Sequence, residues 1–204
     1  MIAIDGPAGA GKSSVARAVA ERLGFTYLDT GAMYRCVALA AADRAEPPAA
    51  VAEGVQIELD HDRVRLDGRD VTEAIRAPEV TEGASRVAVD PEVRAALVAK
   101  QQALLRRGEW VAEGRDIALV VAPEAEVKVF LTAAPEERAR RRAAQVGGDE
   151  ATVLREQALR DARDSSGARS VTEPAPDAIT LDTTGLSLEE VVERIAALAL
   201  EARR

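Results

Sequence analysis

The chain has 204 residues, a formal net charge of −8, 47% hydrophobic residues and 30% charged residues. This balance is typical of a soluble globular protein that forms one domain, or one domain with small insertions. The acidic charge argues against nucleic-acid and membrane-surface partners, and the sequence shows neither an apolar run that could span a bilayer nor a signal peptide. The single cysteine, Cys36, excludes an intramolecular disulfide and fits a cytoplasmic location.

The first part of the chain alternates between strand and helix patterns. An apolar run over 1–5 predicts a buried strand, and apolar positions at helical spacing predict a helix over 12–23 that stops at the following glycine. A short strand over 26–29 and a helix over 33–42 follow. The Pro-Pro pair and the glycine within 44–54 favour an irregular connector.

The pattern then changes to a period of two. Apolar and polar residues alternate over 55–68 on both sides of a polar turn, which predicts a β-hairpin. A helix is expected over about 78–88. The next helix begins with Asp90 as its N-cap and Pro91 as its first residue, and ends near Gly108. The hairpin interrupts the alternation of strands and helices, so we interpret it as an insertion.

The rest of the chain returns to single strands and helices. Three further strands are predicted, over 109–116, 127–132 and 178–184. Charged helices are expected over 135–146 and 150–163, and Ser187 with Glu190 predicts a capping box for the last helix. The whole pattern predicts one parallel α/β domain with a small mixed insertion.

The stretch "GPAGAGKS" matches the phosphate-loop pattern G-x-x-x-x-G-K-[ST] at every position, between a predicted strand and a predicted helix. Glycines let backbone N–H groups converge on phosphate oxygens, and the helix N-terminus adds partial positive charge. Lys12 is placed to follow the β- and γ-phosphates, and the Ser13 hydroxyl can ligate Mg²⁺. We therefore predict binding of a nucleoside triphosphate.

Two other segments place polar side chains at the carboxyl ends of predicted strands, the edge where ligands bind in open α/β sheets. "LDTGAMYR" supplies Thr30, Tyr34 and Arg35, which could form a second anion pocket. "AEGRD" supplies Arg115, whose guanidinium can hold a phosphate, and Asp116. A solvated ion pair is the alternative interpretation of this last segment.

Arginines are concentrated in the two predicted charged helices. On the first, Arg138, Arg141 and Arg142 share one face, and the second carries Arg160 and Asp164. Phosphoryl transfer needs cations around the transferred group and exclusion of water, and a lid that carries arginines would meet both needs. Taken alone, such a charge run is more often a solvated surface.

Together, these motifs resemble those of bacterial cytidylate kinases, a family of P-loop nucleoside monophosphate kinases. The resemblance runs along almost the whole chain and rests on "IDGPAGAGKSS", "LDTGAMYR", "EVTEGASRVA", "PEVRAAL", "AEGRD", "VKVFLTAAPEERARRR" and "DAITLDTT". It implies transfer of the γ-phosphoryl group of ATP to CMP or dCMP with Mg²⁺, giving ADP and CDP or dCDP. It also implies a three-layer α/β fold of the P-loop type with a parallel five-stranded sheet.

The resemblance further implies how the chain is divided. The core would comprise 1–53 and 91–204, with a short helical lid at about 135–165. A small α+β subdomain that binds the monophosphate would be inserted at about 54–90. We expect a monomer that acts on these small substrates.

Site residues follow from the same resemblance, position by position. The residues implied for ATP binding are Gly6, Pro7, Ala8, Gly9, Ala10, Gly11, Lys12, Ser13 and Ser14, with Ser13 also a ligand of Mg²⁺. Those implied for binding CMP are Thr30, Tyr34, Arg35, Ser85, Arg94, Arg115, Asp116, Arg160 and Asp164. Those implied for catalysis are Lys12, Arg138, Arg141, Arg142 and Arg160.

Two positions depart from the family pattern. Thr30 stands where a serine is usual and retains the hydroxyl. Gly167 stands where relatives commonly carry an arginine, and the nearest basic residue is Arg169. Either Arg169 takes over that contact, or the contact is missing.

Two other functions stay open at this point. One is a different small-molecule P-loop kinase, acting on UMP, AMP or a non-nucleotide acceptor such as shikimate. The hairpin insertion and the Arg115–Asp116 pair disfavour shikimate. The other is a nucleotide-binding module without catalysis, in which the arginine-rich helices would have no use. A switch GTPase is disfavoured because the guanine-reading N-K-x-D stretch is absent from the sequence.

Overall fold

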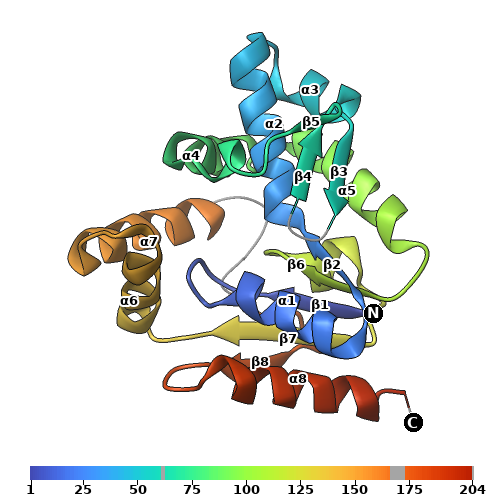
Figure 1. The fold of residues 1–204 in the computed structure, drawn as a ribbon, viewed down its shortest axis with the longest axis vertical. Helices are drawn as coiled ribbons and strands as arrows, with labels where there is room; N and C mark the ends of the chain where they lie inside the picture. The colour runs from blue at the N-terminus through green and yellow to red at the C-terminus, as the bar shows by residue number, and fades with distance from the viewer. Residues whose placement is uncertain (61–62, 166–172, 204) are drawn as a thin grey trace. The chain divides into compact units, whose positions relative to one another are not determined.

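The computed structural model of the chain describes residues 1–60, 63–165 and 173–203 (Figure 1). The chain forms two compact units. The first consists of Met1–Tyr27 and Glu109–Arg204, and the second of Leu28–Gly108. The second unit is wider than the insertion expected over 54–90, because the helices on either side of that segment pack with it.

The main sheet contains the strands that the sequence predicted. They are β1 (Ile2–Asp5), β2 (Thr26–Asp29), β6 (Trp110–Glu113), β7 (Val127–Thr132) and β8 (Ile179–Asp182), in the order β2-β6-β1-β7-β8. β1 pairs in parallel with β6 and β7, and β7 with β8. All four residues of β1 are buried, which explains its continuous apolar run. The loops that follow β1, β6 and β7 therefore meet at one edge.

Helices α1 (Lys12–Leu23) and α8 (Leu188–Glu201) pack against each other and against the sheet (Figure 1). Their shared core is aliphatic: Ile2, Ile4, Val15, Val19, Val111, Val129, Leu131, Val191 and Ile195. The left-handed Gly24 ends α1, with φ at 69°, and the predicted capping box of Ser187 and Glu190 begins α8.

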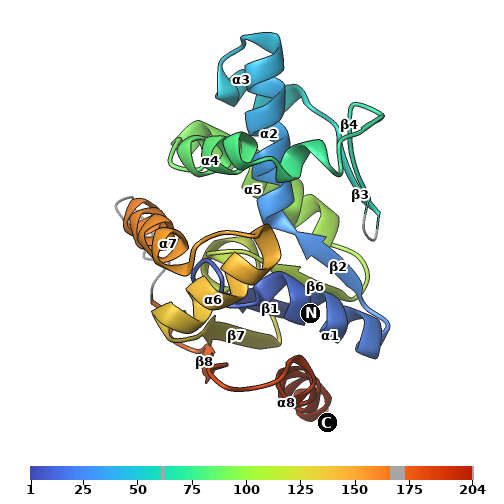
Figure 2. The ribbon, with the colours of Figure 1, turned by 60° about the vertical axis from the view of Figure 1, so that its left-hand side comes forward.

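Two charged helices complete the first unit. They are α6 (Pro135–Val146) and α7 (Glu150–Ser165), which lie side by side in both views (Figures 1 and 2). Ala139, Ala143 and Val153 form the small core between them. A π-helical segment, η2 (Ile117–Val121), follows β6 and contacts β1.

The second unit combines helices with a small antiparallel sheet. The helices are α2 (Thr30–Arg44), α3 (Pro48–Gly54), α4 (Pro78–Val87) and α5 (Pro91–Leu105), with a 3₁₀ turn, η1 (Ala74–Arg76). The predicted hairpin is confirmed as β3 (Ile57–Asp60) and β4 (Arg63–Leu66), and β5 (Arg69–Asp70) adds a third strand. The single cysteine, Cys36, is buried in α2, and burial raises the pKa of its thiol to about 12.

Two expectations about these elements were wrong. The connector expected over 44–54 contains helix α3, because Pro48 stands at the first helical positions, where proline is favoured, and alanines follow. Helix α2 begins at Thr30 rather than at 33, because the Asp29 side chain accepts the Ala32 N–H at 2.8 Å and caps the helix. The π-helical turn after β6 was not predicted.

Within the described residues, the helices are too short or too polar to cross a lipid bilayer.

The exit of the chain from β1 requires a glycine. Gly6 has a φ of 147°, and an added Cβ would lie 2.1 Å from the carbonyl oxygen of Leu131 on the neighbouring strand. Gly24 also has a positive φ, 69°, but nothing lies within 4 Å of its Cβ position.

We therefore expect Gly6→Ala to destabilise the protein by more than about 4 kcal/mol, since β1 and β7 must separate. Gly24→Ala should cost only about 1–2 kcal/mol, for the left-handed conformation alone. Urea unfolding of the two variants measures the difference. Equal losses would contradict the close approach at Gly6.

Candidate active site

The phosphate loop lies between β1 and α1, as the sequence predicted. Gly6, Gly9 and Gly11 have φ values of 147°, 77° and 88°, a region that favours glycine. Gly11 is the N-cap of α1, and no side chain caps that helix end. The N–H groups of the first helical turn, with their partial positive charge, are therefore available to an anion.

Three consecutive carbonyl groups of this loop accept hydrogen bonds from three different cationic side chains. Arg115 Nη1 donates to the Gly6 oxygen at 3.0 Å and Lys12 Nζ to the Pro7 oxygen at 2.8 Å. Arg138 Nη1 donates to the Ala8 oxygen at 2.7 Å. The structure thus brings together three of the predicted site residues at the loop.

The surroundings of Lys12 disfavour the charged form of its ammonium group. Burial of its ammonium group, followed by the nearby charge of Arg115, lowers its pKa from 10.5 to about 7. A phosphate bound in the loop would supply the opposite charge and restore the protonated form.

A buried carboxylate, Glu113, faces the loop serine. Glu113 is the last residue of β6 and is 5% exposed. Its Oε1 accepts hydrogen bonds from the Ser13 hydroxyl at 2.5 Å and from the Tyr27 hydroxyl at 3.1 Å. Our sequence reasoning missed Glu113, although an acidic residue that ends an apolar strand beside a phosphate loop could have indicated it. Groups of three or more His, Cys, Asp or Glu side chains suited to a metal do not occur among the described residues.

Asp5 fixes the segment that follows β6. Its two carboxylate oxygens accept the N–H groups of Ile117 and Ala118, each at 2.8 Å. Asp5 is 5% exposed, and burial raises its pKa from 3.8 to about 6, although the two N–H bonds oppose the shift. Arg115 and Asp116 directly precede this turn. By holding the turn, Asp5 therefore fixes the backbone position from which both side chains extend. Asp116 is itself buried.

The arginines of α6 and α7 differ in their surroundings. Arg138 is buried and pairs with Asp161 of α7 at 2.8 Å. Arg141 donates to Glu137 and to the hydroxyl and carbonyl of Thr183, and its Nη1 lies 3.8 Å from the Cβ position of Gly11. Arg142 is exposed and Arg160 is half-buried. Although Arg138, Arg141 and Arg142 share one face of α6, they therefore differ in burial and in hydrogen-bond partners.

Several predicted acceptor residues belong to the second unit. Thr30, Tyr34 and Arg35 lie on the first turns of α2, where the Asp29 carboxylate holds Arg35 Nη2 at 2.8 Å. Ser85 is buried on α4, which packs against α2. Arg94 is half-buried on α5, which also contacts α2.

Some of the predicted side chains lie outside the described part of the chain. Asp164 lies near the end of α7, but its side chain is outside the described residues. The expectations for Gly167 and Arg169 also lie outside them.

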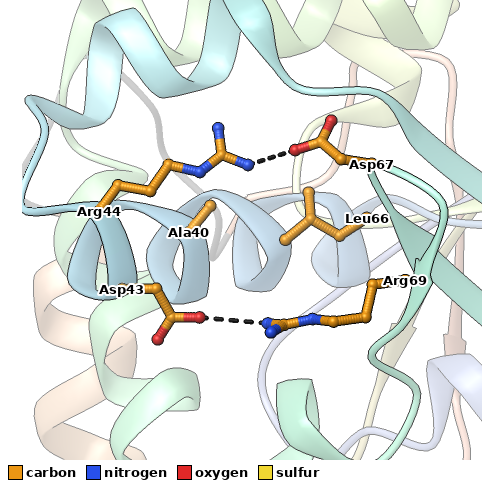
Figure 3. Close-up of a pocket in the computed structure, with 6 residues that line it drawn as sticks. All are labelled: Ala40, Asp43, Arg44, Leu66, Asp67 and Arg69. Carbon is orange, nitrogen blue, oxygen red and sulfur yellow. Dashed lines mark hydrogen bonds and ion pairs between the residues drawn. The ribbon is translucent and has the colours of Figure 1, made fainter.

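The second unit also contains a cavity of about 310 Å³ between α2 and the small sheet (Figure 3). Asp43 pairs with Arg69 at 3.2 Å and Arg44 pairs with Asp67 across it. Ala40 and Leu66 complete its lining. None of these six lining residues is among those expected to bind CMP.

Comparison with known proteins identifies close relatives. A protein-family model for cytidylate kinase matches residues 2–201. The cytidylate kinase of Desulfitobacterium hafniense (strain Y51) is 50% identical over 211 residues, which cover 97% of this chain and 91% of the relative. The cytidylate kinase of Solibacter usitatus (strain Ellin6076) is 48% identical over 208 residues, which cover 96% of this chain and 90% of the relative.

A solved structure supports the fold. A gluconokinase from Sinorhizobium meliloti 1021 aligns with a TM-score of 0.53 at 19% identity, covering 99% of this chain and 93% of that one. At such low identity the likeness concerns the fold alone, and it agrees with the α/β class that the sequence predicted.

The pKa of Asp5 leads to a prediction about stability. Because its folded-state pKa of about 6 exceeds the ordinary 3.8, the folded chain binds this proton more tightly than the unfolded chain does. Asp5 should therefore contribute more to the free energy of unfolding as the pH falls from about 7 to about 4, by up to about 3 kcal/mol.

Asp5→Asn lacks this titration and serves as the reference. We expect the stability of the original protein relative to Asp5→Asn to rise on acidification, as measured by urea unfolding at a series of pH values. Parallel pH profiles, or a difference of the opposite sign, would contradict the raised pKa.

Proposed function

Because the chain belongs to the cytidylate kinase family, we propose that it transfers the γ-phosphoryl group of ATP to CMP or dCMP, giving ADP and CDP or dCDP. The observation that supports this most directly is a complete phosphate loop whose carbonyls are held by Lys12, Arg115 and Arg138. Such a loop keeps its N–H groups directed at an anion.

ATP would bind through the loop residues from Gly6 to Ser14. Lys12 would follow the β- and γ-phosphates, and Arg141, near Gly11, would add positive charge from α6. Arg142 is exposed on the same helix, and Arg160 lies on the neighbouring one. We propose that these arginines surround the transferred group, which needs cations spread over its equatorial oxygens.

The residues next to the loop fit a magnesium ion that arrives with the nucleotide. Ser13 and Glu113 supply oxygen donors 2.5 Å apart at the carboxyl edge of the sheet, and Mg²⁺ prefers oxygen ligands. Mg²⁺ is usually held by one or two protein groups together with substrate phosphates, so a larger protein cluster is not required. We propose Ser13 as the direct ligand and Glu113 as the carboxylate that orients it. When bound, the ion would offset phosphate charge.

The residues proposed for CMP follow the family pattern. We propose that Thr30, Tyr34, Arg35 and Arg94 bind its phosphate and that Ser85, Arg115 and Asp116 recognise the cytosine ring. Arg160 and Asp164 would hold its phosphate and sugar. The Asp29 carboxylate supports this assignment, because it orients Arg35 while it caps the same helix.

The reaction needs no general base. The attacking oxygen belongs to a phosphate that is already anionic, so the protein has to align two substrates and offset charge. Lys12 and the arginines would provide the charge, in a site that excludes water. We further propose that the chain acts as a monomer in the cytoplasm, a location that its single cysteine fits. The net charge of −8 disfavours polyanionic partners, which supports small-molecule substrates.

A coupled assay of ADP release tests the reaction. With ATP and Mg²⁺, we expect turnover with CMP and dCMP that exceeds turnover with UMP and AMP. Preference for UMP or AMP would contradict the acceptor but keep the class of enzyme. Binding of ATP without turnover on any acceptor would instead favour the nucleotide-binding module.

The pKa of Lys12 predicts that ATP binding is linked to proton uptake. At pH 8 a group with a pKa near 7 is mostly neutral, and bound phosphates would restore its proton, so we expect net uptake of up to one proton per ATP. Titration calorimetry in buffers of different ionisation enthalpy measures this number. Lys12→Arg is the control, because arginine stays charged and should remove the uptake. Equal uptake by both proteins would rule out Lys12 as its source.

A further inference from the structure

Asp161 of α7 closes a ring of hydrogen bonds around one peptide group of the phosphate loop. Its Oδ1 accepts the Ala8 N–H at 3.3 Å, and its Oδ2 accepts Arg138 Nη1 at 2.8 Å. The same Arg138 nitrogen donates to the Ala8 carbonyl at 2.7 Å. One ion pair therefore binds both the N–H and the carbonyl of Ala8.

The ring is shielded from solvent. The side chains of Arg138 and Asp161 are 11% and 14% exposed, so their attraction is weakly screened. Gln157, also on α7, donates to the Arg138 carbonyl at 3.3 Å. A Cβ at Gly9 would lie 2.5 Å from the Gln157 amide nitrogen and 3.1 Å from the Arg138 carbonyl oxygen. α6 and α7 thus pack directly on the loop, and the ring lies at that contact.

A second arginine extends the arrangement. Arg115 Nη1 lies 4.0 Å from Asp161 Oδ1 and donates to the Gly6 carbonyl at 3.0 Å. Asp161 is therefore the anion shared by two arginines, each of which holds a loop carbonyl. Charge-assisted hydrogen bonds of this kind are about twice as strong as neutral ones, and they fix the direction of the groups they join.

We infer that Asp161 is a positioning residue, which through Arg138 holds the Ala8 peptide group and so keeps the phosphate loop in the conformation that binds the donor nucleotide. This inference rests on the proposed binding of ATP to the loop. It gives Arg138 a role in supporting the loop main chain, in addition to its proposed place among the lid arginines. A preorganised loop binds phosphate without first having to order its backbone.

The test compares Asp161→Asn with Glu156→Gln. Both changes remove one negative charge from α7, but Glu156 is exposed and has no part in the ring. Calorimetry with ATP and Mg²⁺, without acceptor, is run at a temperature where circular dichroism shows every variant to be folded. We expect Asp161→Asn to raise the Kd for ATP about tenfold, and Glu156→Gln to leave it unchanged within about twofold.

Kinetics separate positioning of the loop from a general structural role. In Asp161→Asn the KM for ATP should rise about tenfold, while the KM for CMP stays within about twofold. A loss confined to thermal stability, or a rise in the KM for CMP alone, would overturn the inference. Since ATP binding is measured without acceptor, a failure of the proposed CMP reaction would be seen separately.

A double-mutant cycle tests whether the ring acts as a unit. Arg138→Gln opens it from the other side and should weaken ATP binding to a similar extent. The double variant should bind ATP no more weakly than the weaker single variant, because either change alone already breaks the ring. Effects that multiply in the double variant would overturn the shared role.

Amide exchange gives a readout that does not depend on any variant. In the original protein, free of nucleotide, the Ala8 N–H should exchange slowly, because Asp161 accepts it. Exchange of the Ala8 N–H at the rate of an unprotected amide would overturn the inference even if no variant folds.

Discussion

A phosphate loop has to leave enough of its N–H groups open to the ligand while its carbonyl groups are held by the rest of the protein. In this chain the carbonyls of Gly6, Pro7 and Ala8 are held by Arg115, Lys12 and Arg138, which come from different parts of the first unit. The sheet edge after β6, helix α1 and helix α6 therefore depend on one another through the loop. Displacement of any one of them would change the direction of the loop peptides.

The cationic side chains around the loop concentrate positive charge there even without a nucleotide. Carboxylates that are buried or largely buried lie close to this charge and offset it. Glu113 meets Ser13, Asp161 meets Arg138, and Asp5 lies at the base of the loop with its charge against two backbone N–H groups. Desolvation still dominates at two positions, since it lowers the pKa of Lys12 and raises that of Asp5. The pKa values of both groups therefore lie close to neutral pH. The negative charge of a bound nucleotide would raise the pKa of Lys12 and favour its protonated form.

Local patterns in the sequence predicted most elements of the fold. The apolar runs of the strands, the caps at Asp90 and Ser187 and the spacing of the phosphate loop each depend on residues close in the chain, and each is confirmed. Helix α3 was missed because a Pro-Pro pair is found both in irregular connectors and at the start of helices, and the local sequence did not distinguish the two. The first and last residues of the second unit depend on the packing of α2 against α4 and α5. Such contacts between distant segments cannot be predicted from a local sequence pattern.

The site shows the same limit more strongly. Asp161 contacts Ala8 across 153 positions of sequence, and Glu113 contacts Ser13 across 100, so no spacing rule could have joined them. The helical period predicted that Arg138, Arg141 and Arg142 share one face, yet it could not tell a buried arginine from an exposed one. That distinction depends on where α7 packs.

The solitary thiol in α2 has a practical consequence. Cys36 is fully buried, and because burial raises its pKa to about 12, almost no thiolate forms at neutral pH. A thiol reagent can therefore reach it only when the helices of the second unit open. The rate of labelling at this one sulfur reports local unfolding of that unit, without an introduced probe and against a background free of other cysteines.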